Sequence, residues 1–509
     1  MRTTFETRTH SCCIIPYYQF VVGFENPFQN IFTKGRRMPV MTRRQFMKAG
    51  IAGAGLAAGL SANAPAGASE PPNIIFLLTD DQRWDTLGCM GNDIIQTPHI
   101  DALAASGVVF DNAYVSTSIC APSRATYLSG QYVCHHGIND FQKTFSDQQW
   151  AATYPAILHE AGYATGFVGK YGVGSDMPED KFTFWRGYPG QGHYEQKDDQ
   201  GNYKHLTQVH EETALEFLRE YGGKNPFCLS VSFKAPHCQD GDARQFIYDP
   251  RYSELYDDMV IPPPETADSR YYEQFPEFFR NNNEARKRWE IRFSEPELYQ
   301  QMTRAYYRLI TGVDRVVGAL CKELDALGLA ENTIILFTSD NGFFLGEHGL
   351  AGKWYAYEPS IRVPLLVYDP RLPEALRGSR RAEMTINADI APTLLSVAGL
   401  TPPNTMQGRD LTPLIQNLET PWREDFYYEH TFNHPGIPKS EGVIGQRYKY
   451  IRYYESSPLY EELFDRREDP NEKQNLAACP EHAGSLRRMR ERCEELKAQC
   501  CRNGDISVE

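Results

Sequence analysis

The chain has 509 residues and more acidic than basic side chains, 66 Asp and Glu against 52 Lys and Arg, for a formal net charge of −14. A general binder of polyanions would be basic, so we expect no nucleic-acid partner, and an anionic ligand has to bind in a local cationic pocket. The 12 cysteines lie at scattered spacings that fit neither a zinc site nor a disulfide framework. A bond from Cys493 to Cys500 or Cys501 would join thiols about two helical turns apart, which is too far.

Residues 41–68 carry the pattern of a twin-arginine (Tat) signal peptide. Two adjacent arginines stand before an apolar run at 49–60, which is shorter than the roughly 20 residues of a membrane span. Small-x-small cleavage sites follow that run. We therefore predict export by the Tat machinery of a bacterium to the periplasm or the cell exterior. Residues 1–40 resemble no targeting element, and we interpret them as a gene-model extension before a true start at Met38 or Met41.

Two short apolar, β-branched runs, at 73–79 and 333–339, are predicted to form buried parallel strands. Each run ends in a pair of oxygen-bearing side chains: Asp80 and Asp81 after the first, Asp340 and Asn341 after the second. Because ligands bind beyond the carboxyl ends of the strands in an open α/β sheet, the two pairs can converge on one pocket. Three carboxylates and an amide oxygen suit one hard divalent cation, Ca²⁺ or Mg²⁺.

Between these two strands lies the run C-A-P-S-R-A-T-Y-L-S-G, from Cys120 to Gly130. Pro122 favours a helix start, so we expect Cys120 at a helix N-terminus, where free N–H groups favour an anionic group. Arg124 follows about one helical turn later and is expected on the same face. The run resembles the signature of the type I sulfatases. In that family the Cys is oxidised to formylglycine, whose hydrated form attacks the sulfur of a sulfate ester.

Three further segments place a basic side chain at the end or the start of a strand-like run. Lys170 and His237 each end such a run, and Lys353 precedes one. Together with Arg124 they would neutralise the charge of a bound sulfate.

The resemblance to sulfatases extends from about residue 72 to the segment 460–476, which is similar to the closing motif of the family. It implies an alkaline phosphatase-like α/β fold and hydrolysis of sulfate esters on carbohydrates. It also implies a partner that matures the enzyme, a formylglycine-generating enzyme or its equivalent. A non-catalytic, glycan-binding relative would be expected to have lost a metal or nucleophile residue, and none is lost.

The same resemblance assigns roles to the candidate site residues. One calcium ion would be bound by Asp80, Asp81, residue 120, Asp340 and Asn341. Residue 120, as formylglycine, would also be the nucleophile. Arg124 and Lys170 would hold the formylglycine and the sulfate. His237 and Lys353 would bind sulfate or help to protonate the leaving oxygen.

One departure from the family concerns the third strand. Many sulfatases have Gly-Lys-Trp-His there, and this chain reads Gly-Lys-Tyr-Gly over 169–172, so the histidine that assists the hydrated aldehyde is absent. His135, His136 and His348 are the candidates to replace it. The Gly-Lys-Tyr version and the opening T-D-D-Q-R-W-D are similar to the glucosamine-6-sulfatase branch, which implies 6-sulfated N-acetylglucosamine at a chain end. The alternatives are another sulfated sugar, galactosamine or uronic acid, and phosphodiester or phosphonate hydrolysis within the superfamily.

Residues 72–400 alternate strand-like and helical runs, as in a large, mainly parallel sheet flanked by helices. A helix is expected over 297–327, where apolar side chains repeat at helical spacing and form a core-facing stripe. The three prolines at 262–264 and the charged stretch 265–296 before this helix are expected to cover the surface. Residues 401–509 contain short aromatic strands and a charged terminal helix, which predicts a smaller α+β subdomain with an antiparallel sheet.

The segment 182–203 is rich in aromatic and glycine residues, and two interpretations stay open for it. It forms a wall that stacks on sugar rings, or it is a surface loop whose aromatic side chains pack on each other. His430 and His434 are candidates to face the pocket from the smaller subdomain.

Overall fold

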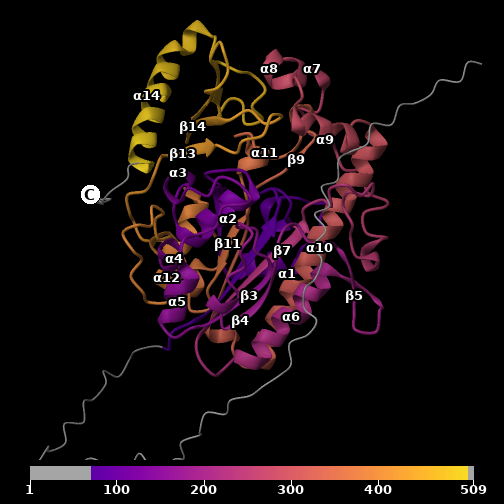
Figure 1. Cartoon of the computed structure of the whole chain (residues 1–509), viewed down its shortest axis with the longest axis vertical. Coiled ribbons are helices and arrows are strands. Elements are labelled where there is room, and N and C mark those ends of the chain that lie inside the picture. Colours follow the sequence, from indigo (N-terminus) through magenta and orange to yellow (C-terminus); the bar gives the residue numbers. More distant parts are fainter. Residues whose placement is uncertain (1–69, 502–509) are drawn as a thin grey trace, which may run out of the picture. The chain divides into compact units, whose positions relative to one another are not determined.

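The computed structural model describes residues 70–501 (Figure 1). The predicted extension and signal peptide lie outside the described residues, as does the segment 502–509. None of the helices between residues 70 and 501 is long and apolar enough to cross a membrane.

A mixed sheet of eight strands forms the centre of the larger part of the chain (Figure 1). Its strands lie in the order β12 (Ser379–Ile386), β2 (Val108–Tyr114), β11 (Leu365–Tyr368), β8 (Thr333–Ser339), β1 (Asn73–Asp80), β7 (Phe227–Pro236), β3 (Ala164–Lys170) and β4 (Phe184–Tyr188). Neighbouring strands are parallel except at β11, which is antiparallel to both β2 and β8. The predicted fold class, a mainly parallel sheet flanked by helices, is confirmed.

Helices cover both faces of this sheet because its strands are apolar on both sides. Ile75 and Leu77 of β1 face one core, and Ile74 and Phe76 face the other, since successive side chains of a strand alternate. The first core is closed by α1 (Pro98–Ser106), α6 (Leu206–Tyr221) and α10 (Pro296–Ala326). The second is closed by α2 (Cys120–Ser129), α5 (Tyr154–Glu160) and α12 (Ile390–Val397) (Figure 1).

The helix predicted over 297–327 is α10, and its predicted apolar stripe is buried throughout: Tyr306, Leu309, Ile310, Val313, Val317 and Leu320. The stretch before it folds into three short helices, α7 (Ser269–Glu273), α8 (Glu277–Arg280) and α9 (Glu284–Arg292). Helix α9 packs against β10 (Ala351–Gly352), which pairs with β9 (Phe344–Leu345). The stretch therefore does more than cover the surface, because it brings α9 next to a loop of the main domain.

The C-terminal part contains an antiparallel sheet of four strands, as predicted: β13 (Asp425–His430), β14 (Ser440–Gly445), β15 (Tyr448–Tyr453) and β16 (Tyr460–Asp465). The terminal helix α14 (Ala483–Cys500) packs on β13, β14 and β15. The remaining α-helices and strands of residues 70–501 are α3 (Val133–His136), α4 (Asp147–Ala151), α11 (Glu358–Ile361), α13 (Thr412–Ile415), β5 (Glu195–Lys197) and β6 (Tyr203–His205).

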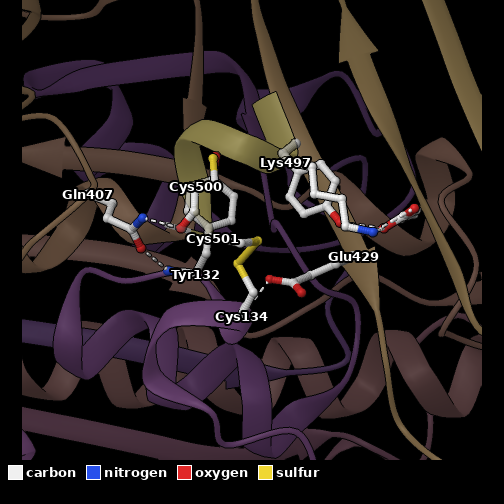
Figure 2. The surroundings of a disulfide bond; sticks show 9 residues. Tyr132, Cys134, Gln407, Glu429, Lys497, Cys500 and Cys501 are labelled. Carbon is white, nitrogen blue, oxygen red and sulfur yellow. Dashed lines mark hydrogen bonds and ion pairs between the residues drawn. A yellow bond between two sulfur atoms is a disulfide. The ribbon is translucent and has the colours of Figure 1, made fainter. Parts of the chain in front are cut away.

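A disulfide that the sequence did not indicate joins the two parts of the chain. It links Cys134 of α3 to Cys501, which follows α14, across 367 positions (Figure 2). The two Cα atoms lie 5.3 Å apart, within the usual range for a disulfide, and Cys493 is buried and free. The backbone N–H of Cys134 also donates to Glu429 Oε1 of β13 at 2.9 Å. The end of the terminal helix is thus tied to the segment that follows α2.

Candidate active site

The carboxyl ends of β1 and β8 bring four oxygen-bearing side chains together. The two strands pair in parallel up to this end, so Asp80 and Asp81 lie beside Asp340 and Asn341. The carboxylate of Asp340 accepts the backbone N–H of Asp81 at 3.2 Å, and Asn341 Nδ2 donates to Asp81 Oδ1 at 2.6 Å. All four side chains are buried. The structure therefore brings together the four predicted metal ligands from the two strand ends.

Helix α2 places Cys120 and Arg124 over this cluster. Cys120 opens the helix, and its Sγ lies 3.5 Å from Asp80 Oδ1. Arg124, one turn further, donates from Nε to Asp340 Oδ2 at 2.8 Å, and its Nη2 lies 3.4 Å from Asp80 Oδ2. The start of the helix is fixed by Ser123, whose hydroxyl donates to the backbone oxygen of Asp340 at 2.5 Å.

Three further basic side chains meet the same carboxylates. Lys170, the last residue of β3, forms an ion pair with Asp80, and Lys353 forms one with Asp81. Lys353 Nζ also lies 2.9 Å from Cys120 Sγ. His237, directly after β7, has Nε2 3.5 Å from Asp81 Oδ2. Every residue that the sequence assigned to the site thus lies in one buried cluster, while the role of each stays a prediction.

The charges in this cluster shift the pKa values of its members. Burial alone would raise the pKa of Asp80, but the charges of Lys170, His237 and Arg124 hold it well below its usual value. Burial, together with the charge of Asp80, raises the pKa of Cys120 to about 12. The unmodified thiol is therefore protonated at neutral pH and is a weak nucleophile, since the thiolate is the reactive form.

The cluster also fits a divalent cation. Asn341 Oδ1 is buried and accepts no hydrogen bond from any residue between 70 and 501. Buried polar atoms are rarely left without a partner, so this oxygen points to a ligand outside the polypeptide. Carboxylates and amide oxygens are the ligands that Ca²⁺ and Mg²⁺ prefer. Ligand atoms of Asp80, Asp81, Cys120 and His237 all lie within 4.8 Å of one another.

Arg124 fills the space beside Gly172, where many sulfatases have a histidine. A Cβ atom at this position would lie 2.8 Å from Arg124 Cδ, and the backbone φ is +72°. None of the three candidate replacements, His135, His136 and His348, lines the pocket in front of Cys120. His136 bonds instead to Thr126 and to the backbone of Ile138, and His348 lies against Tyr357.

A pocket of about 220 Å³ opens in front of Cys120. Its walls come from loops that are far apart in sequence: Ile119, Phe141, Gln191, His237, Asp240, Glu284, Arg288, Lys353, Trp354, Phe432, His434 and Ile437. His434 therefore faces the pocket from the smaller subdomain, whereas His430 is fully buried away from it. The sequence missed most of these walls, although Asp240 stands only three positions after the predicted His237.

The aromatic side chains of segment 182–203 pack mainly on β3 and α6, and none of them lines the pocket as a sugar-stacking wall. Trp185 stacks on Phe167, Tyr188 stacks on His210, and Tyr194 is fully buried. From this segment only Gln191 reaches the pocket, where its side chain accepts a hydrogen bond from Lys170 at 2.7 Å. The aromatic side chains of the pocket come from other loops: Phe141, Trp354 and Phe432.

Comparisons with known proteins agree with this geometry. The family model described as Sulfatase matches residues 72–400, and the model described as N-sulphoglucosamine sulphohydrolase, C-terminal, matches residues 346–499. An N-acetylglucosamine-6-O-sulfatase of Bacteroides thetaiotaomicron is 30% identical over 496 residues, covering 84% of this chain and 86% of the relative.

Two solved structures are similar to this chain. One is the structure of a protein in complex with its substrate, D-glucosamine-2-N,6-O-disulfate. Its TM-score is 0.72 and its sequence identity is 28%, and the match covers 85% of this chain and 98% of that chain. The other is a phosphonate monoester hydrolase of Silicibacter pomeroyi, with a TM-score of 0.72 and coverage of 84% and 95%. At 21% identity the second likeness shows a shared fold alone.

Proposed function

The chain belongs to the sulfatase family and hydrolyses sulfate esters, and on that premise we propose that it removes the 6-sulfate of N-acetylglucosamine at the end of a glycan chain. The convergence of Cys120, the carboxylates and the basic side chains in one buried pocket carries the chemistry. The choice of sugar is supported by the 30% identity to an N-acetylglucosamine-6-O-sulfatase. It is also supported by the likeness to a structure with D-glucosamine-2-N,6-O-disulfate bound, a sugar that carries a 6-sulfate.

Residue 120 acts as formylglycine, made from Cys120 by a maturation enzyme. The buried thiol has its pKa raised to about 12 and offers little thiolate, so the unmodified side chain is a weak nucleophile. The hydrated aldehyde supplies a hydroxyl group at the same position. Lys353 Nζ, 2.9 Å from Cys120 Sγ, is placed to donate a hydrogen bond to the reacting atom of residue 120.

Asp80, Asp81, Asp340, Asn341 and residue 120 would hold a calcium ion, which would supply positive charge to polarise the sulfate ester. The protein side chains then neutralise the sulfate. Arg124 is fixed by Asp340 at 2.8 Å, and Lys170 is fixed between Asp80 and Gln191. Their ammonium and guanidinium groups need no reorganisation when an anion arrives, which is the condition for strong electrostatic stabilisation.

His237 supplies a proton to the leaving oxygen. Its Nδ1 lies 2.5 Å from the backbone oxygen of Cys238, which orients the ring and leaves Nε2 on the side of Asp81. Burial lowers the pKa of the free His237 to about 3. An anionic sulfate beside Nε2 favours the protonated ring and so prepares the donor for the reaction.

Initial rates of sulfate release test the choice of substrate. The panel contains 6-sulfated N-acetylglucosamine, 4- and 6-sulfated N-acetylgalactosamine, 2-sulfated uronic acid oligosaccharides, nitrophenyl sulfate and a phosphonate monoester. We expect the first compound to be turned over fastest. A preference of about tenfold for another sugar, which corresponds to about 1.4 kcal/mol in transition-state stabilisation, contradicts the glucosamine assignment. Preferred hydrolysis of the phosphonate would support the alternative activity of the superfamily.

The cellular location of the protein is a separate proposal. Residues 41–68 lead to export through the Tat machinery to the periplasm or the cell exterior of a bacterium. A fusion of these residues to a reporter protein should be exported, and replacement of Arg43 and Arg44 by lysine should stop export. Export of the doubly substituted fusion at the original rate would show that the twin arginines are not the signal.

A further inference from the structure

One wall of the pocket is not explained by binding of the sulfate. It consists of Asp240, from the loop after β7, and of Glu284 and Arg288, from helix α9. The three residues form one charged group: Arg288 Nε donates to Glu284 Oε1 at 2.9 Å, and Arg288 Nη1 lies 3.3 Å from Asp240 Oδ1. The guanidinium of Arg288 also lies over the ring of Trp354, 5.0 Å from its centre. This group is called the charged wall below.

The charged wall is held from behind. Arg292, one turn after Arg288, is fully buried and donates to Asp240 Oδ1 at 3.0 Å. The side chain of Asp240 is nevertheless 47% exposed, and that of Arg288 is 22% exposed. The ion pairs therefore fix both groups while leaving polar atoms accessible at the pocket.

The chemistry of this wall suits the hydroxyl groups of a sugar. A carboxylate only accepts hydrogen bonds and a guanidinium only donates them, whereas a hydroxyl group does both. Neighbouring hydroxyl groups can donate to Asp240 and accept from Arg288 at the same time. A sulfate ester without sugar hydroxyl groups cannot make this pair of hydrogen bonds.

Resting on the proposed function, we propose that Asp240 and Arg288 determine specificity by binding hydroxyl groups of the terminal sugar. The substrate class is thus a sulfated sugar with free neighbouring hydroxyl groups, as distinct from a sulfate ester that lacks them.

The first test compares a saccharide with an ester that has no sugar hydroxyl groups. We would measure kcat/KM on 6-sulfated N-acetylglucosamine and on nitrophenyl sulfate for the parent, Asp240→Asn and Arg288→Ala. Loss of hydrogen bonds to charged groups should lower the saccharide-to-aryl ratio by about tenfold or more, mainly through KM. An equal fall of kcat/KM on both substrates would overturn the assignment of Asp240 and Arg288 to sugar binding. The charged wall would then have only a structural role.

Two variants next to the wall serve as matched controls. Asp242→Asn changes a carboxylate of the same loop that pairs with Arg244, and Lys287→Ala changes an exposed side chain of α9. Neither residue lines the pocket, so the saccharide-to-aryl ratio should match that of the parent. Asp240→Asn removes the charge partner of Arg292, so its folding is checked by thermal unfolding. If Asp240→Asn does not fold, the saccharide-to-aryl ratio of Arg288→Ala tests the proposal, because this variant keeps the ion pair of Asp240 with Arg292.

The second test is the substrate panel given above, measured on the parent enzyme. If the panel above shows a different preferred sugar, the proposed function fails. The ratio test is then run on that sugar, so the two failures remain distinguishable.

Discussion

Replacing Gly172 by alanine is expected to slow sulfate release far more than it destabilises the fold. The residue has φ of +72°, and a Cβ atom there would lie 2.8 Å from Arg124 Cδ and 3.4 Å from Lys170 Cε. The left-handed backbone costs a non-glycine residue about 1–2 kcal/mol, and the overlap adds about 1–3 kcal/mol until a neighbour moves. Arg124 is buried and paired with Asp340, so the overlap can be relieved only if the Arg124 side chain shifts within the site.

Such a shift displaces a group that we expect to hold the sulfate. A misplacement of about 1 Å in an active site can cost about 100-fold in rate, so kcat of Gly172→Ala should fall by about 10- to 100-fold. Gly137→Ala is the matched control: its φ is +74°, and no atom lies within 4 Å of its added Cβ. Both variants are compared by sulfate release and by thermal unfolding. If Gly172→Ala keeps the activity of Gly137→Ala, the contact with Arg124 does not matter for catalysis.

Three further predictions concern the metal, the disulfide and pH. Asp340→Ala should lose most of the bound metal, measured by elemental analysis, and most of the rate of sulfate release. Stoichiometric zinc in the parent, or full activity after exhaustive chelation, would contradict the calcium site. Cys134→Ser with Cys501→Ser should lower the free energy of unfolding by about 2–5 kcal/mol, seen as a lower Tm, and an unchanged Tm would show that the bridge does not stabilise the fold. Burial and the charge of Glu472 raise the pKa of Glu462 to about 7. In the unfolded chain the same carboxyl group loses its proton above about pH 4.3. The folded chain therefore binds one more proton between about pH 4.3 and pH 7, and the free energy of unfolding falls as the pH rises through this range. The Tm of Glu462→Gln relative to the parent should therefore be higher at about pH 8 than at about pH 5, and a difference independent of pH contradicts the shift.

The sequence predicted the parts of the site that depend on strand ends and on one helix turn. Asp80 and Asp340 could be placed together because parallel strands present their carboxyl ends at one edge of a sheet. Arg124 could be placed beside Cys120 because the two residues are separated by about one turn of helix. The fold class was predictable for the same reason, since buried strands and amphipathic helices have local patterns.

The rest depends on contacts between distant segments, which no local pattern records. The disulfide joins residues 367 positions apart, and the charged wall needs α9 to pack against a loop of the main domain. The aromatic segment 182–203 has a composition suited to sugar stacking, and its burial is decided by packing against β3 and α6. The position of Gly172 was clear from the sequence, but the reason for a glycine there, the bulk of Arg124, required the structure.

The state of residue 120 in active protein tests the central claim most directly. Peptide mass spectrometry on protein from its native host, combined with sulfate release from 6-sulfated N-acetylglucosamine, measures modification and activity on the same sample. We predict formylglycine at position 120 in proportion to the activity, and a folded but inactive Cys120→Ala variant. Full activity in protein that carries an unmodified thiol at Cys120 would contradict the account.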